Sequence, residues 1–354
     1  MIDIKYEWNL KDTKFTKDKG KVFSCFSCGG GSTMGYKLAG FDVVGCNEID
    51  KKMMEVYKAN HNPKLSYLES ITTFKDRDDL PDELYNLDIL DGSPPCSSFS
   101  IAGNREKDWG KDKKFREGQA EQVLDTLFFD FIDLAKKLKP KVVIAENVKG
   151  LLMGNAIDYV KKIYKDFDEA GYYCQHFLLN SKNMGVPQKR ERVFFICLRK
   201  DLAEPFLYNS DMFTVLPKIN IEFNEREILF KDIIEVGSTE RLLTGKALEL
   251  WNKRKLGDID LSYPASRGGK ENYMFNYKFL YDNKVSNTII GNDTCPLYNE
   301  PRYRSKLELC RGGSYPIDYN FLNNKEEYLI GMSVPPLMVA QIADRIFNQW
   351  LNKI

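Results

Sequence analysis

Short apolar runs alternate with amphipathic stretches up to about residue 200 of this 354-residue chain. The runs that are short enough to be strands are residues 22–26, 42–46, 87–90, 142–145 and 193–198. The stretches with a helical period are a segment ending near residue 39 and residues 51–60, 122–138 and 156–170. Strands that alternate with helices predict an α/β fold with a doubly wound, mostly parallel sheet. Ligands of such sheets bind at the carboxyl ends of the strands.

The pattern changes after about residue 200. Residues 201–285 are richer in Asn, Lys and Tyr and in irregular turns, which predicts a second, smaller domain. A strong helical period returns at residues 337–351, so the chain is expected to come back to the first domain. We therefore predict a main domain of residues 1–200 plus 286–354 and a small domain of residues 201–285.

Composition excludes some classes of protein. Residues 1–20 are polar, and no apolar run approaches the roughly 18 residues that span a bilayer, so a cytoplasmic protein without membrane contact is expected. The net charge of +1 does not by itself indicate an anionic partner. Cys25 and Cys28 form one C-x-x-C, but the chain has no second such pair and only two histidines, so no metal site is predicted.

A glycine-rich turn follows the first predicted strand and opens a helix. Its residues 26–32 read Phe-Ser-Cys-Gly-Gly-Gly-Ser, and glycines at such a place let the backbone approach a ligand closely. Glu48 ends the next predicted strand, where an acid can accept the hydroxyl groups of a ribose. The turn alone is equally compatible with tight packing. Turn and acid together predict a cofactor of the nucleoside type.

Two further strand ends bring a thiol and a carboxyl group. Cys96 follows the apolar run 87–90 through two prolines, and Glu146 follows the run 142–145. A thiol near helix N-termini can become a reactive thiolate, and a carboxyl group beside it indicates nucleophile and acid chemistry. The alternatives are an inert buried thiol and a glutamate that caps a helix or forms a salt bridge.

Alternating arginines occupy the segment 185–192, Gly-Val-Pro-Gln-Lys-Arg-Glu-Arg, which leads into a predicted strand. In an extended segment Arg190 and Arg192 share one face, and guanidinium groups suit carbonyl oxygens and phosphates. Taken alone, this segment would be interpreted as a solvated charged turn.

These segments, in this order, resemble those of DNA (cytosine-5)-methyltransferases of the bacterial and phage type. The resemblance rests on the glycine turn, Glu48, the Pro-Cys loop, residues 146–148, the Gln-x-Arg-x-Arg segment and residues 331–335, Gly-Met-Ser-Val-Pro. It covers nearly the whole chain. Several positions depart from the usual family pattern. Cys28 stands where the first glycine is common, Ser70 where Asp is common, Ser97 where Gln is common and Met332 where Asn is common. Residues 314–316, Ser-Tyr-Pro, stand in place of Gly-Phe-Pro.

The resemblance implies a class I, Rossmann-like methyltransferase that uses S-adenosylmethionine and releases S-adenosylhomocysteine. Cys96 would attack C6 of cytosine, Glu146 would hold or donate a proton at N3, and Arg192 would bond O2 with Arg190 beside it. The implied cofactor-binding residues are Phe26, Ser27, Cys28, Gly29, Gly30, Gly31, Glu48, Ile49, Ser70, Ile71, Pro94 and Ser333.

Double-stranded DNA is the implied partner, with the target cytosine flipped out of the duplex. The segment 105–116 is rich in Lys and Arg, and residues 201–285 would be the target recognition domain. The candidate DNA contacts are Ser97, Ser98, Arg105, Lys107, Trp109, Lys113, Lys114, Gln188, Arg254 and Arg267. A monomer is expected, and a cognate restriction endonuclease acting on the same site is left open.

Two alternatives stay beside this reading. One is a tRNA or RNA cytosine-5 methyltransferase of the same fold, a branch that usually has a Cys-Phe-Thr segment in its small domain; residues 201–285 contain no cysteine. The other is a non-catalytic DNA-binding relative, against which Cys96, Glu146 and Arg192 argue.

Overall fold

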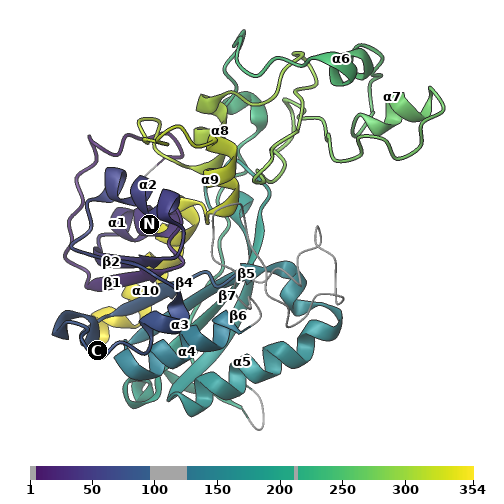
Figure 1. Ribbon diagram of the computed structural model, residues 1–354. Coiled ribbons are helices and arrows are strands. Elements are labelled where there is room, and N and C mark those ends of the chain that lie inside the picture. Colours follow the sequence, from purple (N-terminus) through teal and green to yellow (C-terminus); the bar gives the residue numbers. More distant parts are fainter. Residues whose placement is uncertain (1–4, 96–125, 211–213) are drawn as a thin grey trace.

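The computed structural model describes residues 5–95, 126–210 and 214–354. Within these residues the strands of the main sheet are β1 Lys21–Cys25, β2 Asp42–Glu48, β3 Leu65–Leu68, β4 Ile89–Gly92, β5 Val142–Val148, β6 Tyr172–Asn180 and β7 Glu191–Arg199. Their order is β3-β2-β1-β4-β5-β7-β6 (Figure 1). Strands β3, β2, β1, β4 and β5 pair in parallel, whereas β7 is antiparallel to both β5 and β6. The predicted mostly parallel α/β sheet is confirmed.

Helices cover both faces of this sheet. The α-helices are α1 Gly31–Leu38, α2 Lys51–His61, α3 Ile71–Phe74, α4 Leu127–Leu138, α5 Ile157–Glu169, α6 Gly245–Asn252, α7 Ser262–Ser266, α8 Lys306–Gly313, α9 Glu326–Met332 and α10 Pro336–Gln349. Short 3-10 helices lie at Asp82–Tyr85, Lys149–Leu152, Gly154–Ala156, Ser181–Asn183, Lys200–Leu202, Glu204–Phe206, Phe230–Asp232 and Leu351–Lys353. A two-stranded antiparallel ribbon consists of β8 Leu207–Asn209 and β9 Val215–Pro217.

The alternation of side chains along each strand separates two hydrophobic cores. Val22 of β1 and Ile144 of β5 pack in one core with α1 and α10. Phe23 of β1 and Val143 of β5 pack in the other core with α3, α4 and α5. Because these strands are buried on both faces, they read in the sequence as continuous apolar runs.

The predicted elements were found, with shifted ends, where they fall among the described residues. The sequence pattern missed β3, β6, β8 and β9 and the helices α3, α6, α7, α8 and α9. Strand β6 lies at one edge of the sheet, and its partly exposed face interrupts the apolar run on which strand prediction depends. Of the predicted helix 122–138, the first four residues lie outside the described segments.

A smaller body with its own core stands apart from the sheet and includes α6 and α7 (Figure 1). Its core contains Trp251, Leu261 and Phe279, with Tyr298 and Tyr303 packed against it. Residues near the start of the predicted small domain belong elsewhere: Ala203 and Ile221 are part of the core that contains α1 and α10. Hydrophobic packing therefore places these two residues with the sheet.

Candidate active site

The direction of β7 brings an arginine to the carboxyl edge of the parallel strands. Because β7 runs antiparallel to β5, its first residues lie beside the last residues of β5, with Arg192 opposite Val148 and Phe194 opposite Glu146. Arg192 and Glu146 are therefore diagonal neighbours on one face of the sheet. Their side chains form an ion pair, with 2.8 Å between Nε of Arg192 and Oε1 of Glu146. Only 17% and 11% of these side chains are exposed, so water screens the pair weakly.

Asn147 fixes the backbone that leads to the predicted nucleophile. Its Nδ2 donates a hydrogen bond of 3.1 Å to the carbonyl oxygen of Pro94, and its Oδ1 accepts one of 2.8 Å from the amide of Val148. The end of β5 thus holds the chain two residues before Cys96. Cys96 itself lies outside the described residues, as do Ser97, Ser98, Arg105, Lys107, Trp109, Lys113 and Lys114.

Buried side chains hold the glycine turn in one conformation. Gly30 adopts a φ of 86°, in the left-handed region that favours glycine. The carbonyl oxygen of Gly29 accepts a hydrogen bond from the hydroxyl of Tyr319 and lies 3.3 Å from Nε2 of His61. Burial lowers the pKa of His61 to about 3, so its ring is neutral at physiological pH.

The turn packs directly against the segment that includes Ser333. A Cβ atom on Gly31 would lie 2.7 Å from both Cβ of Ser333 and the carbonyl oxygen of Val334. Ser333 accepts a 2.6 Å hydrogen bond from the hydroxyl of Tyr315 and donates one to the carbonyl oxygen of Leu329. Ser333 therefore supports the glycine turn from behind.

Glu48 at the end of β2 is held by backbone amides. Its Oε2 accepts a 2.7 Å hydrogen bond from the amide of Cys28, and its Oε1 accepts a 2.9 Å bond from the amide of Asp50. Burial raises the pKa of Glu48, and the two backbone amides oppose that shift. Each carboxylate oxygen accepts one described hydrogen bond and has lone-pair capacity for another.

A pocket of about 110 Å³ opens where the glycine turn, β2 and the end of β4 meet. The residues that line it are Phe26, Cys28, Glu48, Ile49, Asp50, Met53, Ser93, Pro95, Tyr328 and Met332. Four of the predicted cofactor residues are among them. Ser70 and Ile71 are not, because Ser70 caps α3 and Ile71 packs in the core beneath it. The sequence argument missed Met53 and Tyr328, which come from two helices and belong to no motif.

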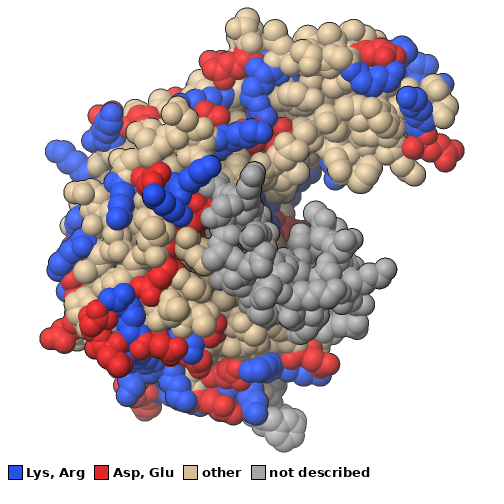
Figure 2. Space-filling view, in the orientation of Figure 1, with Lys and Arg blue, Asp and Glu red and all other residues tan. Residues whose placement is uncertain are grey.

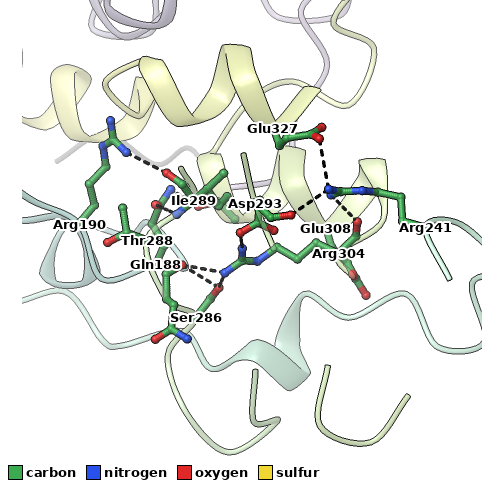
Figure 3. Close-up of polar contacts among 12 residues, drawn as sticks. Gln188, Arg190, Arg241, Ser286, Thr288, Ile289, Asp293, Arg304, Glu308 and Glu327 are labelled. Carbon is green, nitrogen blue, oxygen red and sulfur yellow. Dashed lines mark hydrogen bonds and ion pairs between the residues drawn. The ribbon is translucent and has the colours of Figure 1, made fainter. Parts of the chain in front are cut away.

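Gln188 and Arg190 point into the protein and bind backbone groups (Figure 3). The Gln188 amide contacts the carbonyl of Gly312 and the N–H of Ile289 at 2.8 and 3.1 Å. The guanidinium of Arg190 donates to the carbonyl oxygens of Ile289 and Gly331 at 3.1 and 3.0 Å. Burial lowers the pKa of Arg190 to about 9, which still leaves it protonated near neutral pH.

Arg254 and Arg267 make contacts within the small body. Arg254 stacks on the ring of Trp251 at 3.3 Å and donates to the carbonyl oxygen of Tyr298 at 2.7 Å. Arg267 binds both carboxylate oxygens of Asp258, at 2.8 and 2.7 Å. Each guanidinium thus already uses several of its donors.

Asp91 is a buried acid that the sequence argument did not single out. It lies in β4, on the same face of the sheet as Glu146, and accepts hydrogen bonds of 2.8 Å from Ser24 and 2.9 Å from Tyr36. Burial raises its pKa to about 7. A charged residue directly after the apolar run 87–90 was the available signal.

Neither a metal site nor a membrane span stands out in the described part of the chain. No group of three or more His, Cys, Asp or Glu residues there is arranged to hold a metal ion. Among the described helices, none combines the length and apolar character needed to cross a bilayer.

Comparisons with known proteins place this geometry in context. The family model for C-5 cytosine-specific DNA methylase matches residues 20–348. Type II methyltransferase M.FnuDI of Fusobacterium nucleatum is 38% identical over 182 residues, which are 51% of this chain and 48% of that protein. Type II methyltransferase M.NgoFVII of Neisseria gonorrhoeae is 28% identical over 350 residues, 95% of this chain and 89% of that protein.

The share of each relative that is matched differs widely. The chain spans about half the length of two relatives it matches, 48% of M.FnuDI and 56% of M.NgoPII. Among solved structures, a mutant of Spodoptera frugiperda DNMT2 superimposes with a TM-score of 0.62 at 18% identity, covering 92% of this chain and 99% of that one. At this identity the superposition establishes the shared fold.

Proposed function

This chain belongs to the C-5 cytosine-specific DNA methylase family, and we propose that it methylates C5 of a flipped cytosine in a specific duplex DNA sequence. The observation that supports this most directly is the partly buried Glu146–Arg192 pair at the carboxyl edge of the sheet. Glu146 lies on β5, the strand whose Asn147 anchors Pro94, two residues before Cys96. An acid, a cation and a thiol would then meet at one edge.

The roles proposed for these residues follow the charge that develops on the base. The Cys96 thiolate forms a bond to C6, and negative charge builds towards N3 and O2 while C5 becomes nucleophilic. Glu146 holds a proton at N3, and Arg192 donates a hydrogen bond to O2, so both meet the developing charge with groups already in position. After C5 has taken up the methyl group, loss of the C5 proton and cleavage of the bond between C6 and sulfur restore the aromatic ring and the free thiolate.

The pocket beside the glycine turn fits a nucleoside cofactor. S-adenosylmethionine supplies the methyl group when bound. Glu48 is oriented by two backbone amides and has acceptor capacity for ribose hydroxyls, while Phe26, Ile49 and Met53 give apolar walls. We keep the glycine turn among the binding residues and assign Ser333 to its support, whereas Ser70 caps α3 and Ile71 packs in the core.

Duplex DNA is proposed to bind in the hollow between the sheet and the small body, which Figure 2 shows from one side. Flipping the target base costs a few kcal/mol of stacking, which contacts on both sides can offset. The DNA contacts predicted for residues in the segment from Ser97 to Lys114 remain proposals, because this segment lies outside the described residues. Arg190, Arg254 and Arg267 are better assigned to holding the protein in shape, because their guanidinium groups bind the protein itself.

We also propose new bounds for the recognition domain. Apart from Tyr6, the residues of its two hydrophobic clusters run from Ile228 to Tyr303, in place of the predicted 201–285. A monomer in the cytoplasm and a restriction endonuclease for the same site remain predictions.

The reaction is tested by trapping the covalent adduct. Incubation with S-adenosylmethionine and duplex DNA in which 5-fluorocytosine replaces cytosine should give a protein–DNA adduct that survives denaturing electrophoresis, because fluorine cannot leave as a proton does. Cys96→Ser should give none. Adducts only with fluorinated RNA would indicate the RNA branch, and DNA binding without any adduct would indicate a non-catalytic relative.

The role of Glu146 is tested with the isosteric Glu146→Gln variant. We expect methylation of ordinary duplex DNA to fall by about 10²-fold or more, with DNA binding retained. The matched control is Glu191→Gln, which removes a nearby carboxylate that pairs with Lys149 on the surface. Equal activity of the Glu146 variant and the control would refute the assignment.

A further inference from the structure

The chain passes between its large and small cores at several places that lie close together. The chain leaves the small core at Tyr281 and enters the large core at Ile289. It then returns to the small domain at Cys295, follows it to Tyr303, and enters the large core again at Leu309. Within the continuous described segment 214–354, residues 281–289, 289–295 and 303–309 are thus three neighbouring crossings. Whatever fixes these crossings to one another fixes the small domain relative to the sheet.

One buried arginine on the last crossing bonds to the other two and so links all three (Figure 3). Arg304, on the last crossing, donates to the carboxylate of Asp293 on the middle one. It also donates to the hydroxyl of Ser286 at 2.6 Å and the carbonyl oxygen of Asn287 at 2.8 Å, both on the first. The side chains of Arg304 and Asp293 have no exposed surface.

A second arginine extends this network to the large domain. Arg241 donates to the carbonyl oxygens of Arg304 and Asp293, each at 3.0 Å. Its guanidinium also reaches Glu327 at 3.3 Å, and Glu327 lies on α9 (Figure 3). The Arg304–Asp293 pair is therefore tied to a helix that packs beside α8, as well as to the crossings themselves.

The same network abuts the strand that bears Arg192. Ser286 forms a parallel bridge with Gln188, and the amide of Lys189 donates to the carbonyl oxygen of Ser286 at 2.9 Å. Gln188 precedes Arg192 by only four positions. A rotation of the small domain would thus pull directly on the start of β7, next to the Glu146–Arg192 pair.

A buried ion pair contributes more to the relative orientation of the segments that it joins than to the stability of the protein. Desolvation of two charges offsets most of their attraction, so apolar residues of similar volume often give an equally stable protein. What such residues lack is directional bonding, which here links three segments through one guanidinium group. We propose that Arg304 and Asp293 are positioning residues that fix the recognition domain over the active edge, and so set which DNA sequence is methylated. This inference rests on the proposed function.

The test replaces the pair by apolar side chains in the Arg304→Met/Asp293→Leu double variant. Wild type and variant methylate a duplex library of random sequence, and the methylated cytosines are mapped by sequencing. We expect unchanged S-adenosylmethionine binding, and a fall of about tenfold in the ratio of methylation at the preferred site to sites with one altered base pair. Simple destabilisation lowers the amount of active enzyme at every site equally and leaves this ratio unchanged.

The control is Lys19→Met/Asp344→Leu, which removes a partly buried 3.1 Å ion pair within the large domain and should keep the ratio. A folded Arg304→Met/Asp293→Leu variant with the wild-type ratio overturns the inference while leaving the proposed function intact. If that variant does not fold, the Ser286→Ala variant is used in its place, because it removes one hydrogen bond to Arg304. An unchanged ratio of methylation at the preferred site to altered sites in this variant again overturns the inference. Wild-type protein that methylates no duplex overturns the proposed function together with the inference.

Discussion

Asp91 is a carboxyl group buried within a parallel sheet, where Ser24 and Tyr36 donate to it. Burial raises its pKa to about 7. Between the usual pKa near 4 and this value, the folded chain retains a proton that the unfolded chain has lost. The stabilisation from this residue is thus complete at low pH and is lost as the pH rises through about 7.

Asp91→Asn is therefore expected to remove a pH dependence of folding. The free energy of unfolding of the wild type should fall relative to that of the variant as pH rises from about 4 to 7, by at most about 1.4 kcal/mol per pH unit. Urea unfolding of both proteins at several pH values measures the difference. A difference that stays constant from pH 5 to pH 8 contradicts the expected protonation.

Arg190 and Arg192 show why the type of a residue did not determine its role in the protein. Arg190 and Arg192 are two positions apart, as the sequence argument used, yet only Arg192 pairs with Glu146. Arg190 meets carbonyl oxygens about one hundred positions away or more, at Ile289 and Gly331. Such partners depend on the path of the whole chain, because a long side chain binds whatever acceptor the fold brings within reach.

At the scale of elements, the glycine turn and the start of α1 depend on close contact with the segment before α10. Gly31 is not strained in its backbone, but it has no space for a side chain, since a Cβ atom would approach Ser333 and Val334 to 2.7 Å. The glycine-rich sequence predicted a close approach of backbone to a ligand. At this position the close neighbour is the protein itself.

Gly31→Ala should therefore destabilise the protein by about 1–3 kcal/mol, the usual cost of overpacking, and weaken S-adenosylmethionine binding by displacing the turn. Thermal unfolding and calorimetric titration of the cofactor measure both effects. Gly268→Ala is the control, because its Cβ atom would meet nothing nearer than 3.3 Å. Wild-type affinity in the Gly31 variant would show that the turn does not depend on this contact.

At the scale of the whole molecule, two bodies have separate hydrophobic cores. Trp251 belongs to the small core, where its indole N–H donates to the carbonyl oxygen of Leu297 at 2.7 Å. Trp350 belongs to the large core beneath the sheet and is fully buried. The cofactor pocket draws on the large body.

Trp251→Ala is expected to remove about 3–5 kcal/mol from the small core. DNA methylation should be lost, while S-adenosylmethionine should still bind with wild-type affinity, because no residue of the small core lines its pocket. Trp350→Ala should instead weaken both. Calorimetry and a methylation assay distinguish the two variants, and equal loss of cofactor binding in both would contradict the independence of the cores.

The sequence by itself determined the fold class and the edge of the sheet at which the candidate catalytic residues Glu146 and Arg192 lie. Buried strands require apolar runs and surface helices require an apolar stripe, so local periodicity was enough to predict β1, β2, β4 and β5. Glu48 and Glu146 follow or end such runs, which predicted their place at the carboxyl edge. These are local properties of the chain, set by the alternation of side chains along a strand.

Only the tertiary structure decided which side chains meet. The antiparallel course of β7 brings Arg192 to Glu146, and the three crossings bring Arg304 to Asp293 and Ser286. The same long-range pairing turned Arg190 inward, whereas Arg254 and Arg267 bind groups within the small body. The physical reason is that a periodic pattern encodes whether a residue is buried, whereas a hydrogen bond or ion pair depends on segments that approach one another only in the folded chain.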